Sequence, residues 1–132
     1  MFTTTVKNQI MNAVFNGTTT SLPASFTIGL STTAPNASGK NITEPAASTG
    51  YKRVTGMKFN SASSGKISNS ALIEFPTFTA AAGTVTHYVL YHPTAGTMYW
   101  AGKLKASRTI EADTVVSFPV GNLVIELQDA LE

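Results

Sequence analysis

The sequence predicts a mainly β protein, an antiparallel β-sandwich or flattened barrel of about six to seven strands with one short N-terminal helix. Hydrophobic residues recur with the helical period near the start of the chain and then alternate with period two from Phe26 to Leu127. Segments rich in Gly, Pro, Asn and Ser separate the alternating runs. No strand–helix–strand pattern recurs, so a parallel sheet is not expected. The length of 132 residues provides for a single domain, residues 1–132.

The helix is predicted over residues 3–16. Thr3, Thr4 or Thr5 can cap its N-terminus, and Gly17 stands where a left-handed C-terminal cap belongs. The apolar stripe is wide for so short a helix and consists of Val6, Ile10, Met11, Val14 and Phe15. This stripe either packs on the sheet of its own domain or contacts a partner subunit. Because it exceeds what the edge of one small sandwich covers, it predicts a homo-oligomer.

The β-sandwich is predicted over residues 24–128. The alternation is clearest in "SFTIGLS" and in the last strand, "NLVIELQ", where the residues expected to be buried are Leu123, Ile125 and Leu127. Pro76 interrupts "ALIEFPTF", which indicates an edge strand or a bend. "SASSGKISNS" is interpreted as a turn. The other predicted strands are "YKRVTGMKFN", "GTVTHYVLYH", "TMYWAGKL" and "TVVSFPV".

Charge is sparse in this chain. Charged residues make up 12% of the sequence and the formal net charge is +2, whereas apolar residues make up 42%. The apolar share argues against global disorder. The basic residues Lys103, Lys105 and Arg108 are too few for a nucleic-acid surface and are expected to form one solvated strand face. A surface with so few charges suits a subunit that is partly covered by neighbours.

Residues for catalysis or metal binding are sparse. The chain has no cysteine, its two histidines have no nearby carboxylate cluster, and it has no G-x-S-x-G motif. Glu111 and Asp113 have no opposing base. We therefore expect no enzymatic activity, no metal and no cofactor. No apolar run approaches the roughly 18 residues of a membrane span, and no signal peptide is expected, so synthesis in a cytoplasm is the expectation.

Aromatic residues gather on the two strands that flank the "HPTAG" turn. Tyr88 and Tyr91 precede the turn, and Tyr99 and Trp100 follow it. Rings on adjacent strands pair across a sheet. They either pack in the core or face outward, in which case Tyr91, Tyr99 and Trp100 would be a contact for a receptor or a glycan.

The segment from Leu30 to Val54 is a long polar loop, and its residues carry a resemblance. A strand ending in "LSTTAP", a loop containing glycine, then "TEP" and "GYKRV" resemble a family of small tailed-bacteriophage virion proteins, described as tail fibre or minor tail proteins. The resemblance continues in "ISNSALIEFPTFTAAAGTVTHYVLYH", "AGTMYWAGKL" and "DTVVSFPVGNLVIEL", over roughly residues 24 to 128. Ala34 departs from the pattern, because the family often has an acidic residue there. The matching loop residues are Ser31, Thr32, Pro35, Gly39, Glu44, Tyr51 and Arg53.

Within this loop, Pro35 stiffens the start and Gly39 permits a turn. An ion pair between Glu44 and Arg53 would fold the loop onto the sheet beside Tyr51. The loop is then a structural clasp or a subunit contact, with a receptor-binding tip as the alternative.

The resemblance implies a non-enzymatic virion component that is made in the host cytoplasm. Its expected partners are other copies of itself, with a trimer favoured, and other phage structural proteins. The expected place is a tail or tail fibre. Two alternatives remain open: a capsid decoration or head-fibre protein, and a carbohydrate-binding module that recognises a host-surface glycan.

Overall fold

The computed structural model describes residues 1–18 and 21–127. The fold is mainly β, with antiparallel sheets and one short N-terminal helix, as the sequence predicts. The described residues form eight strands, whereas six to seven are expected from the sequence. Within these described residues the sheets do not close into a barrel, so the flattened-barrel alternative is wrong. In chain order the elements are α1 (Thr4–Phe15), β1 (Phe26–Ser31), the 3-10 helix η1 (Ala47–Thr49), β2 (Val54–Met57), β3 (Lys66–Ser68), β4 (Ile73–Glu74), β5 (Gly83–Tyr91), β6 (Met98–Ile110), β7 (Ser117–Phe118) and β8 (Val124–Glu126).

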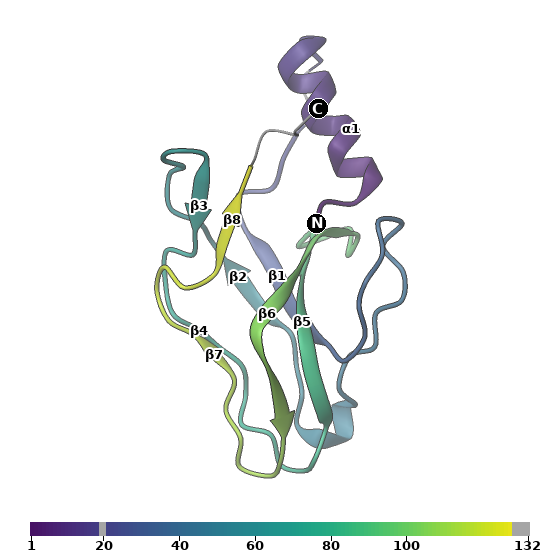
Figure 1. The fold of residues 1–132 in the computed structure, drawn as a ribbon, viewed down its shortest axis with the longest axis vertical. Coiled ribbons are helices and arrows are strands. Elements are labelled where there is room, and N and C mark those ends of the chain that lie inside the picture. The colour runs from purple at the N-terminus through teal and green to yellow at the C-terminus, as the bar shows by residue number, and fades with distance from the viewer. Residues whose placement is uncertain (19–20, 128–132) are drawn as a thin grey trace.

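The largest sheet has four strands in the order β2-β1-β5-β6, and two strand pairs, β3 with β8 and β4 with β7, form the other sheets. Figure 1 shows these short pairs beside the large sheet and α1 at one end of the long axis. Among the described residues, no strand packs along α1. The helix therefore extends beyond the β-domain instead of covering one of its faces.

The main core lies between the large sheet and the short strand pairs. Ile28, Leu30 and Leu90 contribute from the large sheet, and Phe75 and Phe78 contribute from the opposite side. A second cluster on the other face of the large sheet contains Val89, Tyr91, Met98 and Ala101, with Ile42 of the long loop packed on it. The large sheet is thus covered on both faces, which is why β1 is buried on both faces near its end.

The first correction to the predicted strands concerns residues 61–70. This segment contains β3 in addition to a turn, because the backbone groups of Ser63 and Lys66 bond to each other and reverse the chain. Gly65 has a φ of +73° in that turn, a conformation that glycine adopts at little cost. Other predicted strands differ in length: β2 and β7 are shorter than expected, and so is β4, whereas β6 is longer. β6 continues six residues past Leu104 because it keeps pairing with β5 as far as Ile110, and β4 keeps only Ile73 and Glu74 before Pro76.

The helix begins and ends as predicted. The Thr3 hydroxyl accepts a hydrogen bond from the Val6 N–H at 3.4 Å. Gly17 has a φ of +64°, and the Thr18 N–H returns to the Asn12 carbonyl, as expected of a left-handed C-terminal cap. Just before the helix, the Thr3 N–H bonds to the Tyr99 carbonyl of β6. The start of α1 is therefore attached to the edge of the large sheet.

The last strand provides a test of the register. Leu123 and Ile125 are buried as expected, but Leu127 is 64% exposed, because β8 ends at Glu126, where its pairing with β3 ends. We expect Ile125→Ala to lower the free energy of unfolding by about 2–5 kcal/mol. Val124→Thr, at a side chain on the exposed face, should change it by less than about 0.5 kcal/mol. Chemical denaturation measures both, and equal costs would contradict this register.

Candidate interaction surfaces

The long loop is ordered by its own hydrogen bonds. The Asn36 side-chain oxygen accepts bonds from the N–H groups of Ser38 and Lys40 at 3.1 and 3.0 Å. Gly39, with a φ of +76°, completes this turn. Pro35 is buried just before it. Hydrogen bonds within the loop, and not a strand or helix, thus fix the shape of its tip.

The two arms of the loop run side by side. The Thr32 N–H bonds to the Thr43 carbonyl at 2.9 Å, and the Thr33 hydroxyl bonds to the Asn41 carbonyl at 2.7 Å. The buried Ser31 hydroxyl accepts a bond from the Thr43 N–H at 3.1 Å. The second arm of the loop therefore runs back along the first and places Glu44 next to the large sheet.

At that point Glu44, Tyr51 and Arg53 form a bonded cluster, which we call the clasp. Arg53 donates two hydrogen bonds of 2.8 Å to the Glu44 carboxylate, one from Nε and one from a terminal nitrogen. The Tyr51 hydroxyl donates to the same carboxylate at 2.6 Å and accepts from the Leu30 N–H of β1 at 3.0 Å. The expected Glu44–Arg53 ion pair is present, and Tyr51 connects it to the backbone of the large sheet.

Two residues that contact the clasp, Gly29 and Tyr91, are not predicted from the sequence. The Arg53 guanidinium lies 3.8 Å from the ring centroid of Tyr91, a cation–π contact. A β-carbon on Gly29 would lie 2.8 Å from both the Glu44 carboxylate and the Tyr51 hydroxyl, so only glycine fits beneath them. A glycine inside an alternating strand is a sequence signal for such a close approach. Nothing in the sequence indicates that Tyr91 lies under Arg53.

The clasp shifts the acidity of its members. Burial would raise the pKa of the Glu44 carboxyl, but the hydrogen bonds from Arg53 and Tyr51 outweigh burial and hold that pKa below its ordinary value. Burial and the bond to Glu44 raise the pKa of Tyr51. Burial and the Glu44 charge also raise the pKa of Tyr91 to about 12, although Arg53 opposes this. At neutral pH the cluster therefore holds one carboxylate, one guanidinium and two neutral phenols.

Acid is expected to weaken the clasp. The folded-state pKa of Glu44 is below its ordinary value of 4.5, so the carboxylate stabilises the fold above that pH. This contribution is lost as the pH falls through the folded-state pKa. We expect denaturation midpoints to fall more steeply between about pH 7 and pH 3 in the wild type than in Glu44→Gln. Glu74→Gln, at an exposed glutamate outside the clasp, should keep the wild-type slope, and equal slopes in all three proteins would contradict this role.

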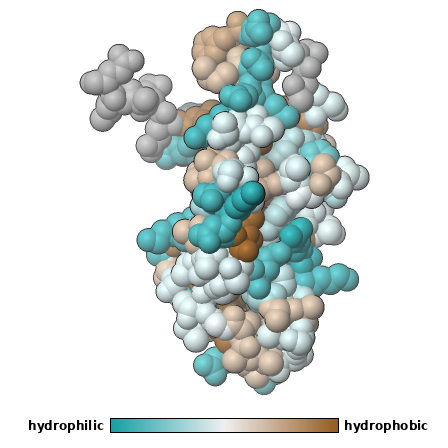
Figure 2. Space-filling model, turned by 90° about the vertical axis from the view of Figure 1, so that its right-hand side faces the viewer, coloured by the Kyte–Doolittle hydropathy of each residue, from teal (hydrophilic) through white to brown (hydrophobic). Residues whose placement is uncertain are grey.

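The apolar stripe of α1 is only partly used by the subunit itself. Val6 is buried and Ile10 is half-buried, so Val6 is not available to a partner and is removed from the predicted contact. The exposed fractions of Met11, Val14 and Phe15 are 56%, 65% and 77%. Residues three and four apart are neighbours on a helix, so these three form one exposed surface, which we call the α1 patch. Hydrophobic side chains are visible at the helix end of the molecule in Figure 2.

The three aromatic candidates do not form a common exposed surface. Tyr91 is only 4% exposed, because the loop and Arg53 cover it, so it is not a surface contact. Trp100 is half-buried, meets the edge of Phe2 and donates a 3.0 Å hydrogen bond to the Tyr88 hydroxyl. Tyr99 is half-buried against Phe26. Tyr99 and Trp100 are adjacent on β6 and so point to opposite faces. The structure therefore gives no aromatic platform of these three side chains.

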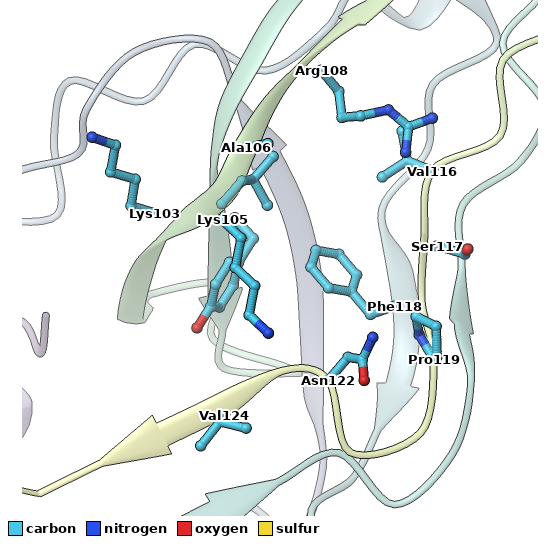
Figure 3. Close-up of a pocket in the computed structure, with 12 residues that line it drawn as sticks. Lys103, Lys105, Ala106, Arg108, Val116, Ser117, Phe118, Pro119, Asn122 and Val124 are labelled. Atoms are coloured by element: carbon cyan, nitrogen blue, oxygen red, sulfur yellow. The ribbon is translucent and has the colours of Figure 1, made fainter.

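A shallow hollow of about 350 Å³ lies between β6 and the segment from Val116 to Val124. Lys103, Lys105 and Arg108 border it and are exposed, in keeping with a solvated strand face. Figure 3 shows the ring of Phe118 between β6 and the opposite chain segment. No acidic side chain lines this hollow.

Metal and membrane sites were also sought. Within residues 1–18 and 21–127, no three His, Asp or Glu side chains lie together as a metal site requires. In the same part of the chain, no helix is long and apolar enough to cross a membrane.

Comparison with known proteins gives one family. The profile of the family described as "Podophage GP4 fiber I protein gp80" matches residues 1–126. The match therefore includes α1 as well as the β-domain and the long loop. No curated protein matches the chain.

Proposed function

The chain belongs to the family described as podophage GP4 fiber I protein gp80 and is therefore a phage fibre-type structural protein of the virion; from this premise we propose that it is a non-enzymatic tail-fibre subunit that assembles as a homotrimer through α1. The observation that supports this assembly is the α1 patch of Met11, Val14 and Phe15, which is exposed in the single chain. The family description supports a fibre, and the attachment to a tail is our inference.

The helix supports contact with other copies of the chain. A helix of 12 residues is marginal in water without packing. α1 is attached to its own domain by Thr3 and Val6 at its start, whereas its second half carries the exposed patch. Lys7 is the one charged residue in α1, so several copies can pack side by side with little charge repulsion. Symmetric association would place the same apolar patch on every partner.

The position of the helix fits a fibre. α1 lies at one end of the long axis in Figure 1, so contact through it leaves the β-domain uncovered. The trimer is proposed because fibre-like virion proteins commonly have threefold symmetry, as the resemblance implies. The clasp, by contrast, satisfies its polar groups within the chain and is proposed to fix the long loop in place. It has no spare charge for a partner, because Arg53 bonds to both oxygens of Glu44.

The mass of the purified protein tests this assembly. Light scattering coupled to size-exclusion chromatography should give three times the chain mass of 13.9 kDa. The mass should fall towards that of one chain on strong dilution. A single-chain mass at every concentration would overturn assembly through α1, and a stable dimer would overturn the trimer.

A further inference from the structure

The C-terminal end of α1 carries a chemically reactive pair of residues, Asn16 and Gly17. This is the one place in the sequence where glycine follows asparagine. In such a pair the backbone nitrogen of the glycine can attack the side-chain amide carbon of the asparagine. A five-membered ring results, and glycine has no β-carbon that would block the approach.

The structure leaves this pair open to solvent. The Asn16 side chain is exposed, and a β-carbon built on Gly17 would meet no atom of the described residues within 4 Å. Figure 1 shows the second half of α1 away from the strands of the β-domain. Asn122 is also exposed, but it is followed by Leu123, whose side chain hinders the same attack. Asn122 therefore provides a comparison within the same molecule.

The backbone at the end of α1 has to open for this reaction. Asn16 has a ψ of 2°, which keeps the Gly17 nitrogen away from the side-chain carbon. Rotation about this bond breaks the 3.1 Å hydrogen bond from the Thr18 N–H to the Asn12 carbonyl. A hydrogen bond that is exchanged for one to water contributes little net free energy. The last turn of α1 therefore reaches the reactive geometry by local fraying in the single chain.

We propose that Asn16 is a site of spontaneous deamidation in the unassembled subunit and that its product prevents assembly through α1. The Gly17 nitrogen bonds to Cγ of Asn16, the bond from Cγ to the side-chain nitrogen breaks, and ammonia leaves with the proton of the Gly17 N–H. Water then opens the succinimide ring at either carbonyl and gives aspartate or isoaspartate. One water molecule is consumed and one ammonia is released, and nothing is oxidised or reduced.

The product changes the end of the helix that carries the α1 patch. A carboxylate at residue 16 lies at the negative end of the helix dipole, where it is unfavourable. Isoaspartate also adds one carbon atom to the backbone, which disturbs the return of Thr18 to Asn12. Because residue 16 directly follows Phe15, contact through the patch would remove water from the new charge, which costs free energy. This effect on assembly rests on the proposed function, whereas the reaction itself does not.

Incubation of the full chain at mildly alkaline pH, followed by peptide mass spectrometry, tests the reaction. Asn16 should convert to aspartate and isoaspartate at least about tenfold faster than Asn122. Asn16→Gln is the matched variant, because it keeps an amide but would need a larger ring, and residue 16 should then stay unchanged. Equal rates at Asn16 and Asn122, or conversion of Asn16→Gln at the wild-type rate, would overturn the assignment.

Asn16→Asp reproduces the charge of the product and tests its effect on assembly. Light scattering should give a dissociation constant at least about tenfold above that of Asn122→Asp, which adds the same charge outside α1. Equal constants would overturn the effect on assembly and leave the reaction site, which mass spectrometry identifies, in place. A wild type that stays a single chain at every concentration would overturn the proposed assembly and this effect together.

Discussion

Asn69→Ala is expected to lower the free energy of unfolding by about 3–5 kcal/mol, among the largest effects of any single substitution in this chain. Asn69 is fully buried. Its Oδ1 accepts the Leu123 N–H at 3.0 Å, and its Nδ2 donates to the carbonyls of Ala71 and Pro119 at 2.9 and 3.0 Å. Alanine would leave these three backbone groups without a hydrogen-bond partner. Each buried polar group that lacks a hydrogen bond costs about 1–3 kcal/mol.

Equilibrium unfolding in urea measures this effect. Asn122→Ala is the matched control, because Asn122 lies in the β7–β8 connection to which Asn69 bonds but has an exposed side chain. It should change the free energy of unfolding by less than about 0.5 kcal/mol. Similar midpoints for the two variants would contradict the role of Asn69. Asn69 lies in "ISNSALIEFPTFTAAAGTVTHYVLYH", one of the stretches that carry the resemblance, and its hydrogen bonds give its presence there a physical reason. Asn69 joins the start of β4 to the β7–β8 connection.

Phe15→Asp is expected to abolish the proposed trimer and leave the subunit folded. Phe15 is the most exposed large apolar side chain of the described residues, at 77%. A carboxylate there stays in water in the single chain but would be buried without a partner in the assembly, which costs much free energy. We expect the dissociation constant to rise by at least about 100-fold, whereas the unfolding free energy of the subunit should change by less than about 0.5 kcal/mol.

Leu72→Asp is the control for that experiment. Leu72 is 55% exposed and lies outside α1, so the same kind of change should leave the oligomer intact. Ile10, also a member of the predicted apolar stripe, is less suitable for this substitution, because it is half-buried within the subunit and a charge there would lower the stability of the subunit itself. If Phe15→Asp keeps the wild-type mass while Leu72→Asp dissociates, the contact lies on the β-domain instead of α1.

Much of the fold could be predicted because its longest signals are local. The 3.6-residue period and the Gly17 cap define α1, and period-two alternation defines β1, β5 and β8. β3 was missed because Ile67 is its one large apolar residue, between Lys66 and Ser68, and only pairing with Ile125, far along the chain, makes it a strand. The length of β6 was underestimated for the same reason. Its second half is polar and exposed, and pairing with β5 keeps it extended.

The interaction sites were harder to predict from the sequence than the fold. Opposite charges at the two flanks of the loop indicated the Glu44–Arg53 pair. Tyr91 joins them only because β1 and β5 pair, with Thr27 opposite Tyr91, and sequence alternation does not reveal which face a strand residue takes relative to a loop. On α1 the sequence indicated an apolar stripe, but not that the domain buries only its first part.

The most direct test of the account is an electron-microscopy map of the intact virion at a resolution that separates helices from strands. The account predicts this chain in a fibre attached to the tail, as three copies related by a threefold axis, with Met11, Val14 and Phe15 of each α1 facing that axis. Copies on the capsid surface would contradict the tail assignment. Copies whose α1 helices point into solvent while the β-domains contact one another would contradict assembly through α1.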